Sequence, residues 1–156
     1  MMTASTVNLL RCMPAAMACL WLAACGGPDE GPEAGLRAWV ARGEALAEDK
    51  DRRGLVELIS PHYTDARGNG RDDIGRMFDL YFLRTNSVAL LTTIDKLEVF
   101  GDDAGEVVLT VGMAGTHDGT FGFSADAYQF AMELERQDQE WLLTSARWGE
   151  LGENLR

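Results

Sequence analysis

The feature that most constrains the fold is a two-residue period of large apolar side chains in the second half of the chain. It occupies residues 106–115 and 125–136. The alternating apolar residues are Val107, Leu109, Val111 and Met113 in the first stretch and Tyr128, Phe130, Met132 and Leu134 in the second. A period of two places every second side chain on the same face of a strand. The chain therefore contains long strands with one apolar face, which is typical of an antiparallel sheet covering a core.

Two further strands extend this series. Residues 87–100 (SVALLTTIDKLEVF) predict an earlier strand, and residues 140–148 (EWLLTSARW) predict a final one. The glycine-containing and acidic sequences GDDAG at 101–105 and THDG at 116–119 are typical of hairpin connections. The pattern therefore predicts four antiparallel strands joined in sequence.

The strand at 87–100 changes phase in the middle. Leu91 and Leu97 share one phase of the alternation, but Ile94 does not, which predicts a bulge or bend near residues 94–96. Strand parity alone would aim the Asp95 carboxylate at the core. A bulge beside it would turn the carboxylate outward, toward a neighbouring lysine or solvent.

The part of the chain before the strands has helical spacing instead. Apolar residues from Leu36 to Ala47 fall on one helical stripe, and a shorter helix is expected over residues 52–59, before Pro61. A third helix follows, with two aspartates in its first turn, where the helix dipole favours acids. Its apolar residues are Ile74, Met77, Phe78, Tyr81 and Phe82.

Three helices followed by four long strands indicate an α+β fold, with the helices packed on one face of a curved antiparallel sheet. The chain has 156 residues, of which 46% are hydrophobic, and this is enough for one domain with a packed core.

The first 24 residues differ from the rest of the chain. They carry one charged side chain, Arg11, and the run from Met13 to Ala24 contains no charged residue and consists mostly of apolar side chains. This layout is typical of a secretory signal peptide. A permanent anchor helix is the alternative, but the apolar run is shorter than the roughly 20 residues that a membrane-spanning helix needs.

The sequence LAACGG, residues 22–27, resembles the lipobox of bacterial lipoproteins, and its first four residues, a leucine, two small residues and a cysteine, match at all four positions. The resemblance implies that Cys25 becomes the acylated first residue and attaches the chain to a membrane through its acyl chains. Gly26 in the next position favours the outer membrane, facing the periplasm, over inner-membrane retention. The expected organisation is a signal peptide at 1–24, the acylated cysteine and a flexible tether at 25–35, the domain at 36–150, and a tail at 151–156.

Composition excludes several kinds of site. Cys12, Cys19 and Cys25 all lie at or before the expected processing point, so the mature domain has no disulfide and no cysteine metal site. Only two histidines are present, and no nucleotide-binding motif occurs, so neither a metal nor an organic cofactor is expected. Removal of Arg11 with the leader leaves 13 basic against 25 acidic residues, a formal charge of −12 that argues against nucleic-acid binding.

The block LVELISPHYTDARGNGRDDIGRMFDLYF at 55–82, the two hairpin sequences and the terminal WLLTSARW resemble the nuclear transport factor 2-like (NTF2-like, or SnoaL-like) superfamily. The resemblance covers about residues 36–150. It implies a cone in which the sheet wraps around the third helix and leaves a pocket at the wide end. Its members include ketosteroid isomerase, scytalone dehydratase, limonene epoxide hydrolase, polyketide cyclases and transport adaptors, and they often dimerise through the open sheet.

The candidate site residues follow from that cone. The pocket candidates are Phe78, Tyr81, Tyr128 and Phe130. Alternation places Tyr63, Asp65 and Arg67 on one side of their segment. Tyr63 and Asp65 are the candidate catalytic pair, since Tyr63 could donate to an oxyanion while Asp65 accepts a proton and Arg67 lowers the Asp65 pKa. The alternative interpretation is a polar turn in which Asp65 makes only local contacts.

Three functional hypotheses remain open from the sequence. The first is a lipid-anchored envelope module that binds an apolar small molecule or an envelope protein without catalysis. The second is an isomerase, dehydratase or hydrolase that uses Tyr63 and Asp65. The third is a purely structural role in which the open sheet forms a homodimer surface, as the resemblance implies. The lack of a complete acid–base set favours the first hypothesis.

Overall fold

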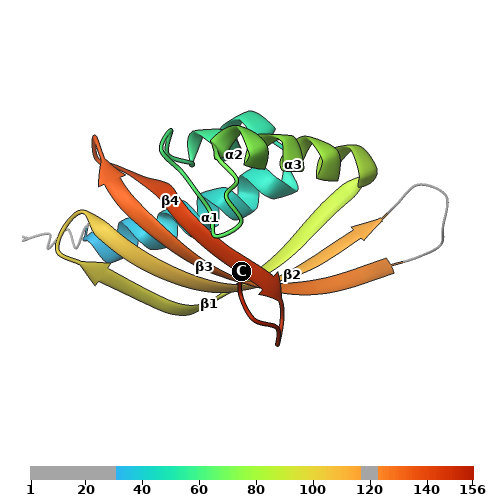
Figure 1. Ribbon diagram of the computed structural model, residues 1–156. Helices are drawn as coiled ribbons and strands as arrows, with labels where there is room; N and C mark the ends of the chain where they lie inside the picture. Colours follow the sequence, from blue (N-terminus) through green and yellow to red (C-terminus); the bar gives the residue numbers. More distant parts are fainter. Residues whose placement is uncertain (1–30, 117–122) are drawn as a thin grey trace, which may run out of the picture.

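The computed structural model describes residues 31–116 and 123–156. Within these residues, three helices precede four strands. The elements are α1 (Pro32–Glu48), α2 (Arg52–Glu57), α3 (Arg71–Arg84), β1 (Ser87–Phe100), β2 (Ala104–Thr116), β3 (Phe123–Gln137) and β4 (Glu140–Glu150). The strands form one antiparallel sheet in the order β1-β2-β3-β4 (Figure 1). The predicted α+β class and the four long strands are therefore confirmed. The predicted signal peptide, Cys25 and residues 117–119 of the THDG connection lie outside the described residues.

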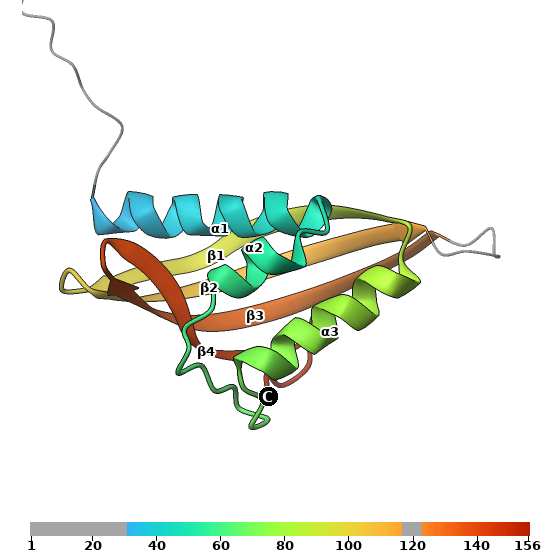
Figure 2. The ribbon, with the colours of Figure 1, turned by 90° about the horizontal axis from the view of Figure 1, so that it is seen from above.

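All three helices lie on the same side of the curved sheet (Figure 1). Seen from above, α1 runs along the β1 side and α3 along the β4 side, with α2 between them (Figure 2). Helix α1 packs directly on β1, whereas α3 packs mainly on α2. The resemblance implied a sheet wrapped around the third helix, but α1 is the helix most closely packed on the sheet.

The core lies between α1 and the concave face of the sheet. Its most deeply buried apolar side chains are Leu36 of α1, Val107 of β2 and Leu134 of β3. Gly105 lies under Leu36, and a Cβ atom there would come within 2.6 Å of the leucine Cδ1 atom. The close approach of α1 to the sheet therefore depends on glycine at this position.

The register confirms the predicted bulge in β1. Pairing between β1 and β2 shifts between Ile94 and Lys96. Asp95 turns to the exposed face of the sheet, where it accepts hydrogen bonds from Thr110 Oγ1 at 2.6 Å and Gln129 Nε2 at 3.5 Å. The outward alternative for this carboxylate is the one found.

Helix α1 begins four residues before the expected position. Its first residue is Pro32, so the helix includes the end of the segment predicted as a tether. Proline suits this position because it needs no amide hydrogen bond at the first turn. Glu33 and Arg37 form an ion pair at 2.8 Å one turn apart, which supports the first two turns.

The apolar stripe of α3 was predicted only in part. Ile74 is buried and Phe78 is half-buried, but Met77 is 41% exposed. Leu80 and Leu83 also face solvent. Helix α3 therefore has apolar residues on both its packed and its open sides.

The last six residues fold back beside the end of β4. The backbones of Arg156 and Trp148 exchange hydrogen bonds at 3.2 and 3.1 Å, and Leu151 N donates to Ala127 O at 2.9 Å. No helix in the described part of the chain is long and apolar enough to cross a membrane.

Candidate functional site

The segment between α2 and α3 carries Tyr63 and Asp65, and it is attached to the free edge of β4. Ser60 N donates to Leu143 O at 2.9 Å, Thr64 N to Thr144 O at 3.2 Å, and Ala66 N to Ala146 O at 3.3 Å. These bonds hold the segment against the sheet. They place the side chains of Tyr63 and Asp65 inside, where these residues are 4% and 5% exposed.

The Asp65 carboxylate organises a turn. It accepts hydrogen bonds from the amides of Arg67 and Asn69, both at 2.8 Å, and from Asn69 Nδ2 at 2.7 Å. Burial alone would raise its pKa, but the hydrogen bonds from Asn69 and Arg67 and the charge of Arg67 outweigh burial and lower the pKa. A carboxylate with three donors and a lowered pKa is a weak proton acceptor, so the geometry matches the turn interpretation.

The Tyr63 hydroxyl lies in a different environment. Burial, with a smaller contribution from the nearby Asp65 charge, raises the pKa of Tyr63 well above its usual range. The hydroxyl therefore stays protonated at neutral pH. Within residues 31–116 and 123–156, no hydrogen bond joins it to another residue, so Tyr63 and Asp65 are neighbours but do not form a hydrogen-bonded pair.

Arg67 does not point inward with the other two residues, as the alternation had suggested. It is exposed, its Nη2 atom donates to Trp148 O at 3.2 Å, and its guanidinium lies 4.5 Å from the centre of the Trp148 ring. The turn at Asp65 interrupts the alternation, and this places Arg67 over β4. Sequence reasoning missed Asn69, the main partner of Asp65, although asparagine next to glycine is typical of such turns.

The four pocket candidates lie on facing elements. Phe78 and Tyr81 belong to α3, while Tyr128 and Phe130 belong to the concave side of β3, opposite Val111 and Leu109 of β2. All four are half-buried. The Tyr81 hydroxyl lies 3.9 Å from Met113 Sδ, and the rings of Tyr128 and Phe130 are 6.5 Å apart. This part of the concave face is therefore aromatic and only partly covered.

Trp148 was not among the pocket candidates, although it belongs with them. It pairs with Phe130 in the β3–β4 register and packs at the edge of the same core. Its place in a terminal strand with no clear alternation gave no signal for this role. The described residues contain no group of three or more histidine, cysteine, aspartate or glutamate side chains that could hold a metal ion.

No protein-family model matches the chain, and no curated protein is similar to it in sequence. Solved structures are similar in fold. A ketosteroid isomerase-like protein from Erwinia carotovora atroseptica aligns with a TM-score of 0.65 at 13% identity, over 80% of this chain and 99% of that one. A protein of the NTF2-like family from Streptomyces avermitilis aligns with a TM-score of 0.65 at 15% identity, over 76% and 95%. The fold is NTF2-like.

A third similar structure is a hexachlorocyclohexane dehydrochlorinase from Novosphingobium barchaimii. It has a TM-score of 0.64 at 13% identity and covers 79% of this chain and 88% of that one. At such identities the likeness extends to the fold alone, because one fold carries many unrelated functions. Isomerases and dehydratases share this NTF2-like architecture with proteins of other kinds, so the function depends on the residues of this chain.

Proposed function

We propose that this chain is a lipid-anchored protein of the cell envelope whose NTF2-like domain binds an apolar small molecule on the concave face without catalysis. The observation that carries the proposal is the contrast between the two candidate groups. The aromatic side chains of α3 and β3 are partly open, whereas the Asp65 carboxylate is fully engaged in its own turn.

The aromatic residues support binding of an apolar ligand for a simple reason. Phe78, Tyr81, Tyr128 and Phe130 present ring faces that remain half-buried, so a ligand in contact with them would remove further apolar area from water. Each 100 Å² of such area contributes about 2.5 kcal/mol. Met113 adds a flexible and polarisable contact beside Tyr81.

Native mass spectrometry on the protein as produced by its host tests this binding. We expect a retained apolar mass in the wild-type protein and its loss in Phe130→Ala, which removes a ring from the concave face. Leu83→Ala is the matched control, because Leu83 lies on the solvent-facing side of α3, away from the concave face of the sheet, and is 83% exposed. Equal retention in both variants would contradict binding on the concave face.

The enzyme hypothesis has its own test at Asp65. If the chain is an isomerase, dehydratase or hydrolase using this carboxylate, Asp65→Asn should abolish turnover of a bound ligand while leaving the free energy of unfolding nearly unchanged. We expect the reverse. Conversion of the retained ligand by the wild-type protein, absent from the folded variant, would replace the binding proposal with an enzymatic one.

The membrane attachment rests on the lipobox sequence at 22–27. Labelled palmitate should enter the wild-type protein and should not enter Cys25→Ala. Cys19→Ala is the control, since this cysteine belongs to the same leader but not to the lipobox position. Labelling of Cys25→Ala, or equal loss of label in both variants, would exclude acylation at Cys25.

A further inference from the structure

A hollow of about 540 Å³ lies at the opposite end of β3 from the pocket candidates, between α1, residues 57–61 and the turn that joins β3 to β4. Its volume is within the range of small-molecule sites. The indoles of Trp39 and Trp141 line it together with Leu58 and Pro61. None of the four pocket candidates of the concave face contributes to it, so it is a separate site.

One unpartnered donor belongs to a residue that lines this hollow. Among the described residues, the buried side-chain nitrogen atoms without a hydrogen-bond partner are Trp39 Nε1 and Arg136 Nε. Trp39 lines the hollow. Arg136 does not itself line the hollow, but two of its neighbours, Trp141 and Gln139, do. Arg136 lies opposite Trp141 in the β3–β4 register, and its Nη2 atom donates to Gln139 Oε1 at 2.7 Å. Buried donors are nearly always satisfied in native proteins, so the orphaned indole N–H of Trp39, a residue of the lining, indicates a missing acceptor.

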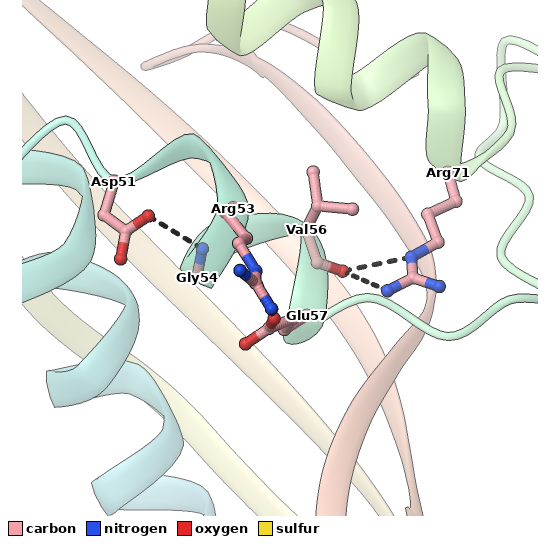
Figure 3. A network of polar contacts seen from close by, with 6 residues as sticks. All are labelled: Asp51, Arg53, Gly54, Val56, Glu57 and Arg71. Atoms are coloured by element: carbon pink, nitrogen blue, oxygen red, sulfur yellow. Dashed lines mark hydrogen bonds and ion pairs between the residues drawn. The ribbon is translucent and has the colours of Figure 1, made fainter.

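The charges around the hollow point to the kind of acceptor. Arg42 and Arg71 line it, as do Glu57 and Glu140. Glu57 is neutralised by Arg53 at 3.0 Å, and Arg71 is held in place by two hydrogen bonds to Val56 O, at 3.1 and 2.9 Å (Figure 3).

Arg42 has no ion pair or hydrogen bond with any residue of the described ranges. The lining itself holds two guanidiniums and two carboxylates. When Arg53, the partner of Glu57, is counted with them, the hollow and its surroundings carry one positive charge in excess, in a chain whose formal charge is −11.

We propose that this hollow binds a small organic carboxylate with an apolar body. The two indoles and Leu58 would contact the apolar body, while the carboxylate would accept hydrogen bonds from Arg42 and from the Trp39 indole. A carboxylate carries the single negative charge that balances the local surplus, whereas a phosphate monoester carries nearly two. Guanidinium and carboxylate groups also match in their planar geometry. This binding is independent of the ligand proposed for the concave face.

Naphthalene-2-carboxylate is a suitable probe, and naphthalene-2-carboxamide is its uncharged match. Titration of each into the purified full chain, followed by calorimetry and by the indole N–H signals in ¹H–¹⁵N NMR spectra, measures affinity and location together. We expect the carboxylate to bind at least about tenfold more tightly than the carboxamide, as for the loss of a charge-assisted hydrogen bond. The indole signals of Trp39 and Trp141 should shift, and the signal of Trp148 should not.

Two variants locate the charge. Arg42→Gln should weaken carboxylate binding by about tenfold, because removing the guanidinium charge loses the same charge-assisted hydrogen bond as replacing the ligand carboxylate by a carboxamide. Arg37→Gln makes the same substitution on α1 outside the hollow, where Arg37 pairs with Glu33, and it should leave the affinity unchanged. Equal affinity for the two probes, equal effects of the two variants, or absence of any shift at Trp39 would each overturn the proposal. Ala38→Trp, which fills the lining from an exposed helix position, should abolish binding without unfolding the protein.

Discussion

Asp65→Asn separates the structural interpretation of the candidate catalytic pair from the chemical one. The carboxylate is buried and accepts three hydrogen bonds, two at Oδ1 from backbone amides and one at Oδ2 from Asn69 Nδ2. Asparagine can keep the two bonds at Oδ1. Its amide nitrogen then faces the Asn69 side chain, donor against donor, unless the Asn69 amide turns over.

The cost of this substitution can be worked from these bonds. A hydrogen bond to a charged group contributes about 1.5–3 kcal/mol, compared with about 1 kcal/mol for a neutral one. The two retained bonds lose their charge assistance and the third is lost or reversed. We therefore expect the free energy of unfolding to fall by about 2–4 kcal/mol.

Urea denaturation followed by tryptophan fluorescence measures the change. Asp102→Asn is the control, because Asp102 is exposed in the β1–β2 turn and should tolerate the same chemical change within about 0.5 kcal/mol. If Asp65→Asn lowers stability no more than the control does, the carboxylate is not a structural element of the turn, and the reasoning fails.

The lowered pKa of Asp65 adds a pH dependence to the same experiment. A carboxyl group whose pKa is lower in the folded state stabilises the fold above its unfolded pKa of about 3.9, and this contribution is lost as the pH falls through the folded pKa. The stability difference between the wild-type protein and Asp65→Asn should therefore be full at neutral pH and narrow below about pH 4. If the stability difference between the two proteins instead grew as the pH fell, the pKa of Asp65 would be raised in the folded state, and the reasoning would be wrong.

The other predictions concern Tyr63 and α3. In an alkaline titration followed at 295 nm, one of the three tyrosines should ionise only above the ordinary range or on unfolding, and Tyr63→Phe should remove that phase while leaving stability at neutral pH nearly unchanged. Ionisation of all tyrosines near pH 10 in the folded protein would contradict the raised pKa. Phe78→Ala should lower the free energy of unfolding by about 2–3 kcal/mol, less than the 3–5 kcal/mol of a fully buried ring, whereas Leu83→Ala should change it by no more than about 0.5 kcal/mol. Equal effects in urea denaturation would mean that the packed side of α3 is assigned wrongly.

The sheet could be predicted from the sequence because each strand buries one face, and the residues of that face are mostly apolar. The alternation from Val107 to Met113 and from Tyr128 to Leu134 matches the register of β2 and β3. The bulge in β1 could also be predicted from the sequence, because Ile94 is out of phase with the alternation of the other apolar residues in that strand. These features depend on residues close together in the sequence, where spacing carries the information.

The start of α1 and the orientation of Arg67 could not be predicted in the same way. Residues 32–35 have the composition of a linker, yet Pro32 suits the first turn of α1, and Leu36 in the next turn is buried between the helix and the sheet. Arg67 lies within the turn that Asp65 and Asn69 form together, and strand alternation does not hold inside a turn. In both cases tertiary contacts overrode the local pattern.

The hollow at Trp39 had no signal in the sequence at all. Trp39 belongs to the apolar stripe of α1, which predicted a core residue, and Arg136 ends the alternation of β3 with an ordinary surface cation. Trp39 and the two neighbours of Arg136 that line the hollow, Gln139 and Trp141, come together only when the β3–β4 turn and residues 57–61 pack around α1. A site of this kind depends on chain segments about 100 residues apart, so spacing cannot reveal it.

The packed centre of the domain keeps the two proposed binding places energetically separate. Leu36, Val107 and Leu134 are almost completely buried between α1 and the sheet. Such an interior resists small displacements, since close-packed side chains move only together. A ligand among the aromatic residues of the concave face and a carboxylate at Trp39 would therefore affect each other only if α1 moved as a whole. Because Gly105 holds α1 tightly against the sheet through Leu36, we expect the two affinities to be independent, so that the loss of one site leaves the other measurable.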